Sequence, residues 1–208
     1  MRQIIYVKYN RTRSEKFQLK TAIVRENGAL SVEKTALTEA GAGHMGSFWE
    51  KYQMIREQNP RIRFLEPEFK DGGKTVCFRY LEGETLADAL ADRIHMGQIP
   101  YEELERVMAL VFPEDFSVDS GHFSIKEQTG GPFAPSQGFT EVFGPVPEGL
   151  EELGRLTAAP NVDGLFENLM ISDGHVYGID YEWVFDMEIP ARFLHYRNLL
   201  YFYRRCEA

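Results

Sequence analysis

Cysteine is scarce in this chain, which has Cys77 and Cys206 in 208 residues and no C-x-x-C pair or Cys/His cluster. The sequence therefore predicts no zinc site and fits a reducing compartment.

Long apolar runs are also missing. The N-terminus, MRQIIYVKYN, reaches Lys8 after a stretch too short for a signal peptide or a membrane span. We expect a cytoplasmic protein.

Positive charge is in deficit, with 23 Lys and Arg against 32 Asp and Glu and a formal net charge of -9. Such a surface repels nucleic-acid phosphates and anionic lipids, so neither is expected as the main partner. The first 25 residues are a local exception and form a basic patch. The hydrophobic share of 43% is enough for one large domain or for one domain with two lobes.

The first 82 residues read as three strands, one helix and two strands. The first three strands are expected over residues 4–9, 18–25 and 30–37, with a hairpin turn at Asn27-Gly28 because both residue types tolerate positive φ. The last two fall within residues 62–82, on either side of Asp71-Gly72-Gly73. Apolar residues at helical spacing predict the helix, which ends near Asn59-Pro60. These residues are Met45, Phe48, Trp49, Tyr52 and Ile55.

The rest of the chain reads as helices followed by a small hairpin. Helices are expected over residues 85–96 and 101–112, the second with Tyr101 on its apolar face, while residues 113–160 resist assignment. Two short strands flank the turn Asp173-Gly174, and a last helix runs over residues 190–203. We therefore expect the chain to divide near residue 82, into an N-terminal part over 1–82 and a C-terminal part over 83–208.

The spacing in residues 161–182 points to chemistry. Asp163 and Asn168 are five residues apart, and after the hairpin comes Asp180. The hairpin folds the chain back, so that Asn168 and Asp180 present oxygen ligands to one point. Magnesium prefers such ligands and usually takes one or two from the protein. The pattern predicts a magnesium site beside an acidic residue, Asp163, that receives a substrate hydroxyl.

The segment NVDGLFENLMISDGHVYGIDYEWVFD resembles the catalytic loop and metal-binding strand of protein-kinase-like phosphotransferases, such as aminoglycoside and choline phosphotransferases and lipopolysaccharide kinases. The run IDYEWVFDMEIP, followed by Tyr196-Arg197, is more closely similar to kinase-like domains found beside bacterial glycosyltransferases, as is FTEVFG at 139–144. The resemblance implies an α+β, protein-kinase-like two-lobed fold with a reduced C-terminal lobe. It also implies a phosphotransferase that uses ATP and Mg²⁺ on a small-molecule hydroxyl, with a sugar or a glycan-linked alcohol as acceptor.

The same resemblance implies roles for residues of the N-terminal half. Lys34, on the third strand, would hold the α- and β-phosphates. Glu50 is the first choice for its glutamate partner, with Glu39 as the rival. The segment FRYLEGETL is similar to the hinge that binds adenine, through the backbone of Tyr80 and Leu81.

The chain departs from that family in three respects, one of which is that only 28 residues follow Asp180. Asn161 stands where the family usually has a loop-bracing His, and NRTRSEKF replaces the glycine-rich loop, leaving Arg11, Arg13 or Lys16 to face the phosphates. Glu182 is either a further metal-side carboxylate or a structural one. The alternative function is a non-catalytic nucleotide-binding or scaffold module of glycan assembly, as part or partner of a glycosyltransferase.

Overall fold

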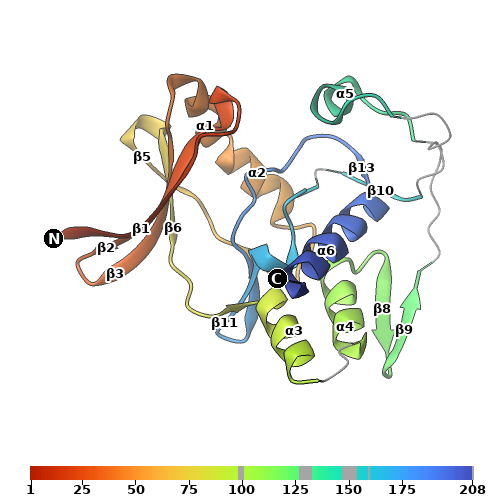
Figure 1. Cartoon of the computed structure of the whole chain (residues 1–208). Helices are drawn as coiled ribbons and strands as arrows, with labels where there is room; N and C mark the ends of the chain where they lie inside the picture. Colours follow the sequence, from red (N-terminus) through yellow and green to blue (C-terminus); the bar gives the residue numbers. More distant parts are fainter. Residues whose placement is uncertain (98–100, 127–132, 147–153, 159, 208) are drawn as a thin grey trace. The chain divides into compact units, whose positions relative to one another are not determined.

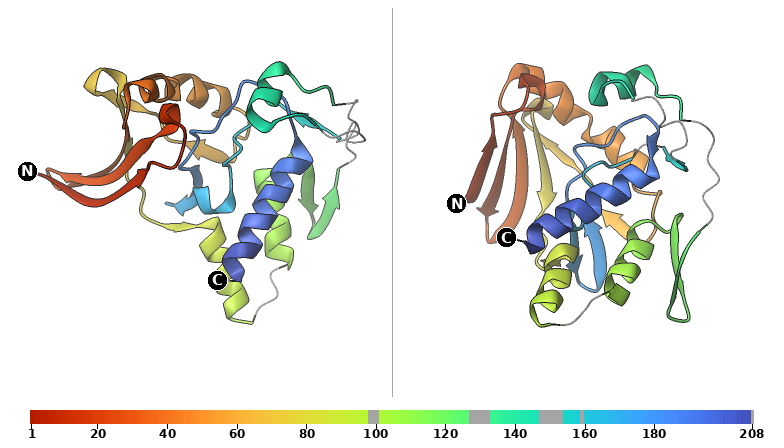
Figure 2. Two further views of the ribbon diagram at one scale, coloured as in Figure 1. Left: turned by 45° about the horizontal axis from the view of Figure 1, so that its top comes forward. Right: turned by 45° about the vertical axis from the view of Figure 1, so that its right-hand side comes forward.

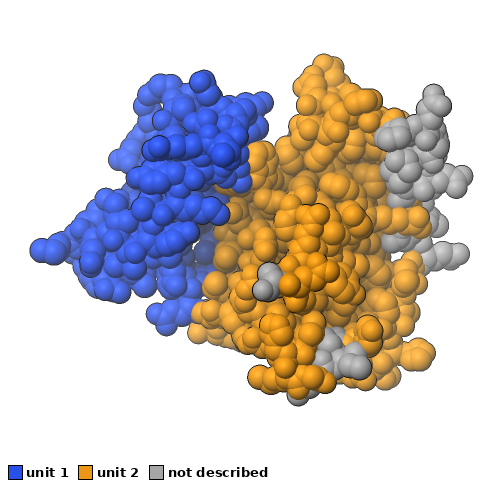
Figure 3. All heavy atoms as spheres, viewed as in Figure 1, with its two compact units in different colours: residues 1–53, 64–82 blue, residues 54–63, 83–208 orange. Residues whose placement is uncertain are grey.

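The structure, a computed structural model, describes residues 1–97, 101–126, 133–146, 154–158 and 160–207. These residues divide into two units: residues 1–53 with 64–82, and residues 54–63 with 83–208 (Figure 3). Strands and helices occur in both units (Figure 1), so the α+β class is confirmed. Among the described residues, no helix has the length and apolar content needed to span a bilayer.

A five-stranded antiparallel sheet forms the first unit. Its spatial order is β1 (Arg2–Asn10), β2 (Leu19–Glu26), β3 (Ala29–Ala36), β6 (Thr75–Arg79) and β5 (Glu68–Lys70). Asn27 (φ 50°) and Gly28 (φ 85°) make the expected turn between β2 and β3. Short 3₁₀ turns, η1 (Glu15–Phe17), η2 (Glu39–Gly41) and η3 (Asp71–Gly73), connect these elements.

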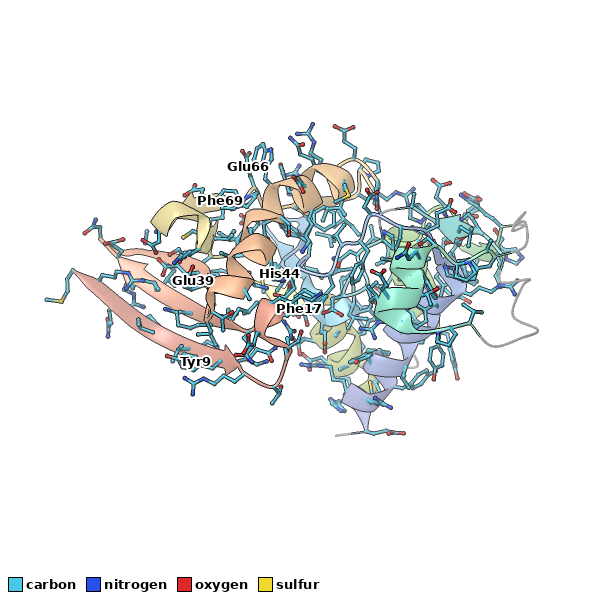
Figure 4. All side chains as sticks on the ribbon, turned by 90° about the horizontal axis from the view of Figure 1, so that it is seen from above. Tyr9, Phe17, Glu39, His44, Glu66 and Phe69 are labelled. Carbon is cyan, nitrogen blue, oxygen red and sulfur yellow. The ribbon has the colours of Figure 1, made fainter. Side chains whose placement is uncertain are left out.

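The helical part of this unit comprises α1 (Ala42–Gly46) and α2 (Phe48–Ile55) as far as residue 53. Met45 and Phe48 are buried, and the Phe48 ring lies 5.9 Å from that of Phe78 on β6. Figure 4 shows Phe17 beside His44, whose ring centroids are 5.0 Å apart. Trp49, expected on the buried stripe, is 39% exposed because α1 and α2 break the continuous helix that the stripe assumed.

The second unit contains a four-stranded sheet in the order β4 (Ile62–Phe64), β12 (His175–Gly178), β11 (Leu169–Ser172) and β7 (Glu84–Thr85). The single strand expected over RIRFLEPEF is divided in two. Its end, Glu68–Lys70, pairs with β6 as expected, whereas Ile62–Phe64 joins the second sheet, so that part of the expectation was wrong. Asp173 (φ 48°) and Gly174 (φ 70°) make the turn between β11 and β12, as expected.

Four helices accompany this sheet among the described residues: α3 (Leu86–His95), α4 (Tyr101–Val111), α5 (Gln137–Phe143) and α6 (Ala191–Cys206). Helix α6 packs against α3 (Figure 2) and against the 3₁₀ turn η4 (Phe166–Asn168). Phe166 and Phe202 meet in this contact with centroids 6.1 Å apart. Tyr101 is 68% exposed, so its expected place on the apolar face of α4 was wrong.

The segment that resisted assignment contains a hairpin of β8 (Phe116–Asp119) and β9 (His122–Ile125), then α5 and β10 (Leu156–Thr157). Strand β10 pairs with β13 (Ile189–Pro190), which leads into α6. Residues 127–132, 147–153 and 159 of this segment lie outside the described part of the chain.

Candidate active site

The loop that carries Asp163 is held by backbone and side-chain hydrogen bonds. Val162 donates its N–H to the Trp183 carbonyl (3.1 Å), and Gly164 donates to the Asn161 carbonyl (3.0 Å). The Asn161 amide donates to the Asp180 carbonyl over 2.9 Å. Asn161 therefore ties the Asp163 loop to the segment that carries Asp180.

Asn168 closes the same loop from its other end. Its side-chain Nδ2 donates to the Asp163 carbonyl (2.9 Å), while its own carbonyl accepts from the Ile179 N–H (3.0 Å). The β11–β12 pairing places Leu169 opposite Gly178, so the chain returns beside Asn168 just before Asp180. Hydrogen bonds therefore join the Asp163 loop, Asn168 and the segment that carries Asp180, as the spacing predicted.

The charges around Asp163 are predominantly negative. Burial raises the pKa of the Asp163 carboxyl above its ordinary value, and the negative charge of Asp180 raises it further. The Arg197 guanidinium lowers this pKa, Glu182 raises it, and the net direction is upward. Such a group of carboxylates is stabilised by a cation that offsets its charge.

The donor set fits magnesium better than a tightly chelated transition metal. Asn168 and Asp180 offer amide and carboxylate oxygens, the hard ligands that Mg²⁺ prefers. Among the described residues, no three His, Cys, Asp or Glu side chains are arranged to hold a metal ion. Magnesium tolerates this because it usually keeps several waters and takes few protein ligands.

Glu182 is a buried carboxylate next to this group. It is 3% exposed, and its N–H donates to Asp180 Oδ1 over 3.3 Å. A buried charge must be paired or must face a cation to be tolerated. Its place beside Asp180 keeps both readings of this residue open, as a further metal-side carboxylate or as a structural one.

Arg197, on α6, makes the direct contact with Asp163. Its Nη2 donates to Asp163 Oδ1 over 2.8 Å, and its Nε donates to the Val162 carbonyl over 3.1 Å. The side chain of Asn198 adds a bond from Nδ2 to the Gly164 carbonyl (3.2 Å). Helix α6 therefore orients the loop, and sequence reasoning missed this role of Arg197.

Aromatic rings flank Arg197 along one stripe of α6. Its guanidinium carbon lies 5.0 Å from the centroid of the Tyr201 ring and 5.9 Å from that of Phe193. The spacing of 193, 197 and 201 is four residues, which places all three on one helix face. Phe193 is 36% exposed and Tyr201 37%. This four-residue spacing was the sequence signal that could have revealed the stripe.

A buried ion cluster fixes the start of α6. Asp115 is fully buried, accepts two 2.7 Å hydrogen bonds from Arg155 Nε and Nη2, and lies 3.0 Å from His195 Nε2. Burial raises the pKa of Asp115, but the bonds from Arg155 and His195 outweigh it and bring the pKa down to about 2. Sequence reasoning gave none of these three residues a role, since 40 or more positions separate them.

The residues expected to bind nucleotide in the first unit lie as follows. Lys34 is buried on β3, with Nζ 5.9 Å from the Phe48 ring centroid. Glu50 is exposed on α2, whereas its neighbour Lys51 is buried and has Nζ 3.3 Å from His44 Nδ1. The rival Glu39 is exposed and pairs with Lys74 at 2.5 Å.

The expected hinge follows β6. Leu81 is buried, and Tyr80 donates its backbone N–H to the Leu30 carbonyl over 3.3 Å. That N–H therefore belongs to the sheet. A base held at this segment would use the carbonyl of Tyr80 and the backbone of Leu81.

No protein-family model matches this sequence, and no curated protein matches it at a significant level. Solved structures similar to it include the apoenzyme of a macrolide 2'-phosphotransferase from Brachybacterium faecium, at 10% identity and a TM-score of 0.41 over 96% of this chain and 77% of that one. A streptomycin–ATP complex of an aminoglycoside phosphotransferase gives 12% identity and a TM-score of 0.38, over 97% and 78%. An aminoglycoside phosphotransferase mutant with ADP and hygromycin B gives 14% and 0.39, over 98% and 79%. At such values, activity and substrate must be argued from the residues themselves.

Proposed function

We propose that this protein is an ATP- and magnesium-dependent phosphotransferase that acts on a small-molecule hydroxyl. The observation that carries the proposal is the single hydrogen-bonded unit formed by the Asp163 loop, Asn168 and the Asp180 segment. Phosphoryl transfer asks a protein mainly for positioning and charge, and this unit offers a carboxylate beside two oxygen ligands. Two free cysteines, Cys77 and Cys206, fit a cytoplasmic location, where ATP is abundant.

Asn168 and Asp180 would hold magnesium, which supplies the positive charge that phosphates need. Burial is the main cause of the raised pKa of the Asp163 carboxyl, and the negative charge of Asp180 adds to it, so a magnesium ion here would offset charge that the two carboxylates share. Lys34 would hold the α- and β-phosphates, with Glu50 as its proposed partner. The backbone of Tyr80 and Leu81 would hold the base.

Asp163 would accept or orient the proton of the acceptor hydroxyl. Its Oδ1 is engaged by Arg197, which turns the carboxylate into one orientation and leaves Oδ2 for a substrate. A hydroxyl at Oδ2 would lie next to the Arg197 guanidinium and the rings on either side of it. The acceptor would therefore rest on the stripe of Phe193, Arg197 and Tyr201.

The chemistry of this stripe favours a neutral, hydroxylated ring such as a sugar or a glycan-linked alcohol. Aromatic faces stack against the C–H face of such a ring, and a guanidinium donates to vicinal hydroxyls. An anionic acceptor would be repelled by Asp180 and Glu182, which outnumber Arg197. The charges at this point therefore disfavour an anionic acceptor.

A non-catalytic nucleotide-binding module, as part or partner of a glycosyltransferase, is the second candidate. The ion pair between Arg197 and Asp163 supports it, since Arg197 already occupies Oδ1 of the carboxylate that a substrate hydroxyl would need. Asn161 in place of histidine points the same way. The retention of Asp163, Asn168 and Asp180 together favours the active enzyme.

Thermal unfolding with ATP, with and without magnesium, is the first test. We expect ATP to raise the melting temperature when magnesium is present, because binding to the folded state stabilises it by mass action.

ADP release in the presence of methyl glycosides would then distinguish an active phosphotransferase from a non-catalytic module. Asp173→Asn is the matched control, because this turn residue has φ 48°, which asparagine tolerates. Equal stabilisation by ATP in excess EDTA would contradict the magnesium site.

A further inference from the structure

Strand β1 is an edge strand that exposes apolar side chains along its whole length. It lies at the end of the five-stranded sheet, opposite the edge formed by β5. Its large apolar residues are exposed by 40–50%: Ile4, Ile5, Tyr6, Val7 and Tyr9. Soluble proteins normally protect such edges, because an unpaired strand recruits another one.

Side chains on one face of the sheet are buried on β2 but exposed on β1. Ile4 lies opposite Val24, and Val7 lies opposite Ala22. Val24 and Ala22 are each 1% exposed, whereas Ile4 is 50% exposed. Directly opposite residues share a face of the sheet, so β1 extends the face beyond what the rest of the unit covers.

The charge around this edge has the opposite sign to the rest of the chain. Residues 1–25 contain seven Arg or Lys and one Glu, against 16 basic and 31 acidic residues in the remainder. Lys8 lies on β1 itself, and Lys20 lies on β2 opposite Tyr9. Among the described residues, this edge therefore combines a run of exposed apolar side chains, Ile4 to Val7, with nearby positive charge.

We propose that β1 is a docking strand for an extended acidic segment of a partner protein. The segment adds to the sheet as a sixth strand, its backbone pairs with β1, and the carboxylates on one of its faces lie beside Lys8. Backbone pairing provides affinity in such complexes, and side chains provide specificity. This role is independent of the phosphotransferase activity.

Two other occupants fit the edge less well. A second copy of this chain would bring an equally basic strand against β1, and like charges on facing strands are destabilising. A lipid surface would leave the outer backbone N–H and C=O groups of β1 without partners, which is costly in an apolar medium. An acidic strand satisfies both the charges and the backbone.

The test uses two labelled nine-residue peptides, one of alternating Glu and Val and one of alternating Lys and Val, titrated by fluorescence anisotropy. We expect the acidic peptide to bind at least roughly tenfold more tightly at low salt, and the preference to shrink as salt is added. Hydrogen exchange should show new protection in residues 2–10. The double variant Lys8→Glu/Lys20→Glu should reverse the preference between the peptides.

A matched pair of variants distinguishes β1 from the opposite edge. Tyr9 on β1 is 49% exposed and Phe69 on β5 is 40% exposed, and Figure 4 labels both. Tyr9→Thr should weaken binding of the acidic peptide roughly fivefold, and Phe69→Thr should leave it unchanged.

Three results would overturn the proposal. The first is equal affinity for the two peptides or protection at β5. The second is concentration-dependent self-association that protects β1. The third is binding to phosphatidylglycerol vesicles, lost in Tyr9→Thr, without binding of the acidic peptide.

Discussion

Replacing Asp115 with Asn should destabilise the protein in a way that depends on pH. The carboxyl has a pKa of about 2 in the folded chain, against an ordinary value of 3.8. That gap, at about 1.36 kcal/mol for each pH unit, amounts to roughly 2 kcal/mol of unfolding free energy. Because the folded pKa is depressed, this stability is fully present above pH 3.8 and is lost as the pH falls towards 2. The cost of leaving Arg155 unpaired comes in addition.

The assay is urea unfolding, followed by tryptophan fluorescence, of the wild type and the Asp115→Asn variant at several pH values. Their difference in unfolding free energy should be clear at pH 5 and should shrink below pH 4. Comparing the two proteins cancels the other carboxyl groups, which titrate in both. Asp119→Asn, at an exposed position on β8, is the control and should show no such trend. A difference of the same size at low pH would mean that packing, not ionisation, is what Asp115 contributes.

Three further outcomes are expected. Asp180→Asn should weaken magnesium-dependent ATP binding in titration calorimetry. Asp163→Asn should leave this binding nearly intact and cut turnover by roughly 10²–10⁴-fold. Unchanged ATP binding in both variants would refute the site. Arg197→Lys should retain more turnover than Arg197→Met at equal ATP affinity, because lysine keeps one charged donor for the Asp163 carboxylate. Identical turnover in the two variants would show that the contact between Arg197 and Asp163 is purely structural. Gly83→Ala should lower unfolding free energy by at least about 3 kcal/mol, since Gly83 has φ 154° and an added Cβ would lie 2.0 Å from a carbonyl oxygen of β11. Gly97→Ala, with open space around it, should cost far less in the same melt.

Several local features of this protein follow from neighbouring residues. Asn27-Gly28 and Asp173-Gly174 both turn with positive φ, as their residue types demand. The strands on either side of each turn follow for the same reason, because turn and strand signals lie within a few residues of each other. The five-residue spacing of Asp163 and Asn168 could likewise be read directly, since one short loop closes it.

Failures of prediction arose where a residue's neighbour is distant in sequence. Nothing in residues 62–64 reveals that they pair with β12, more than 100 positions further along, instead of with β6. The break between α1 and α2 was not predicted. The spacing of apolar residues indicates which face of a regular helix is buried, but it does not show where the helix is interrupted.

Local sequence by itself determined the turns, most of the strands and helices, and the residue types available for a magnesium site. Tertiary structure alone decided which carboxylates share a charge environment. Arg197 reaches Asp163 from 34 positions away, and Asp115 meets His195 from 80 positions away. Such pairs form because helix α6 packs against η4 and is held to Asp115 through His195. Burial then makes the stability of each charged group depend on its partner. Spacing rules extend over one turn or one strand pair, so they cannot anticipate a contact that packing creates.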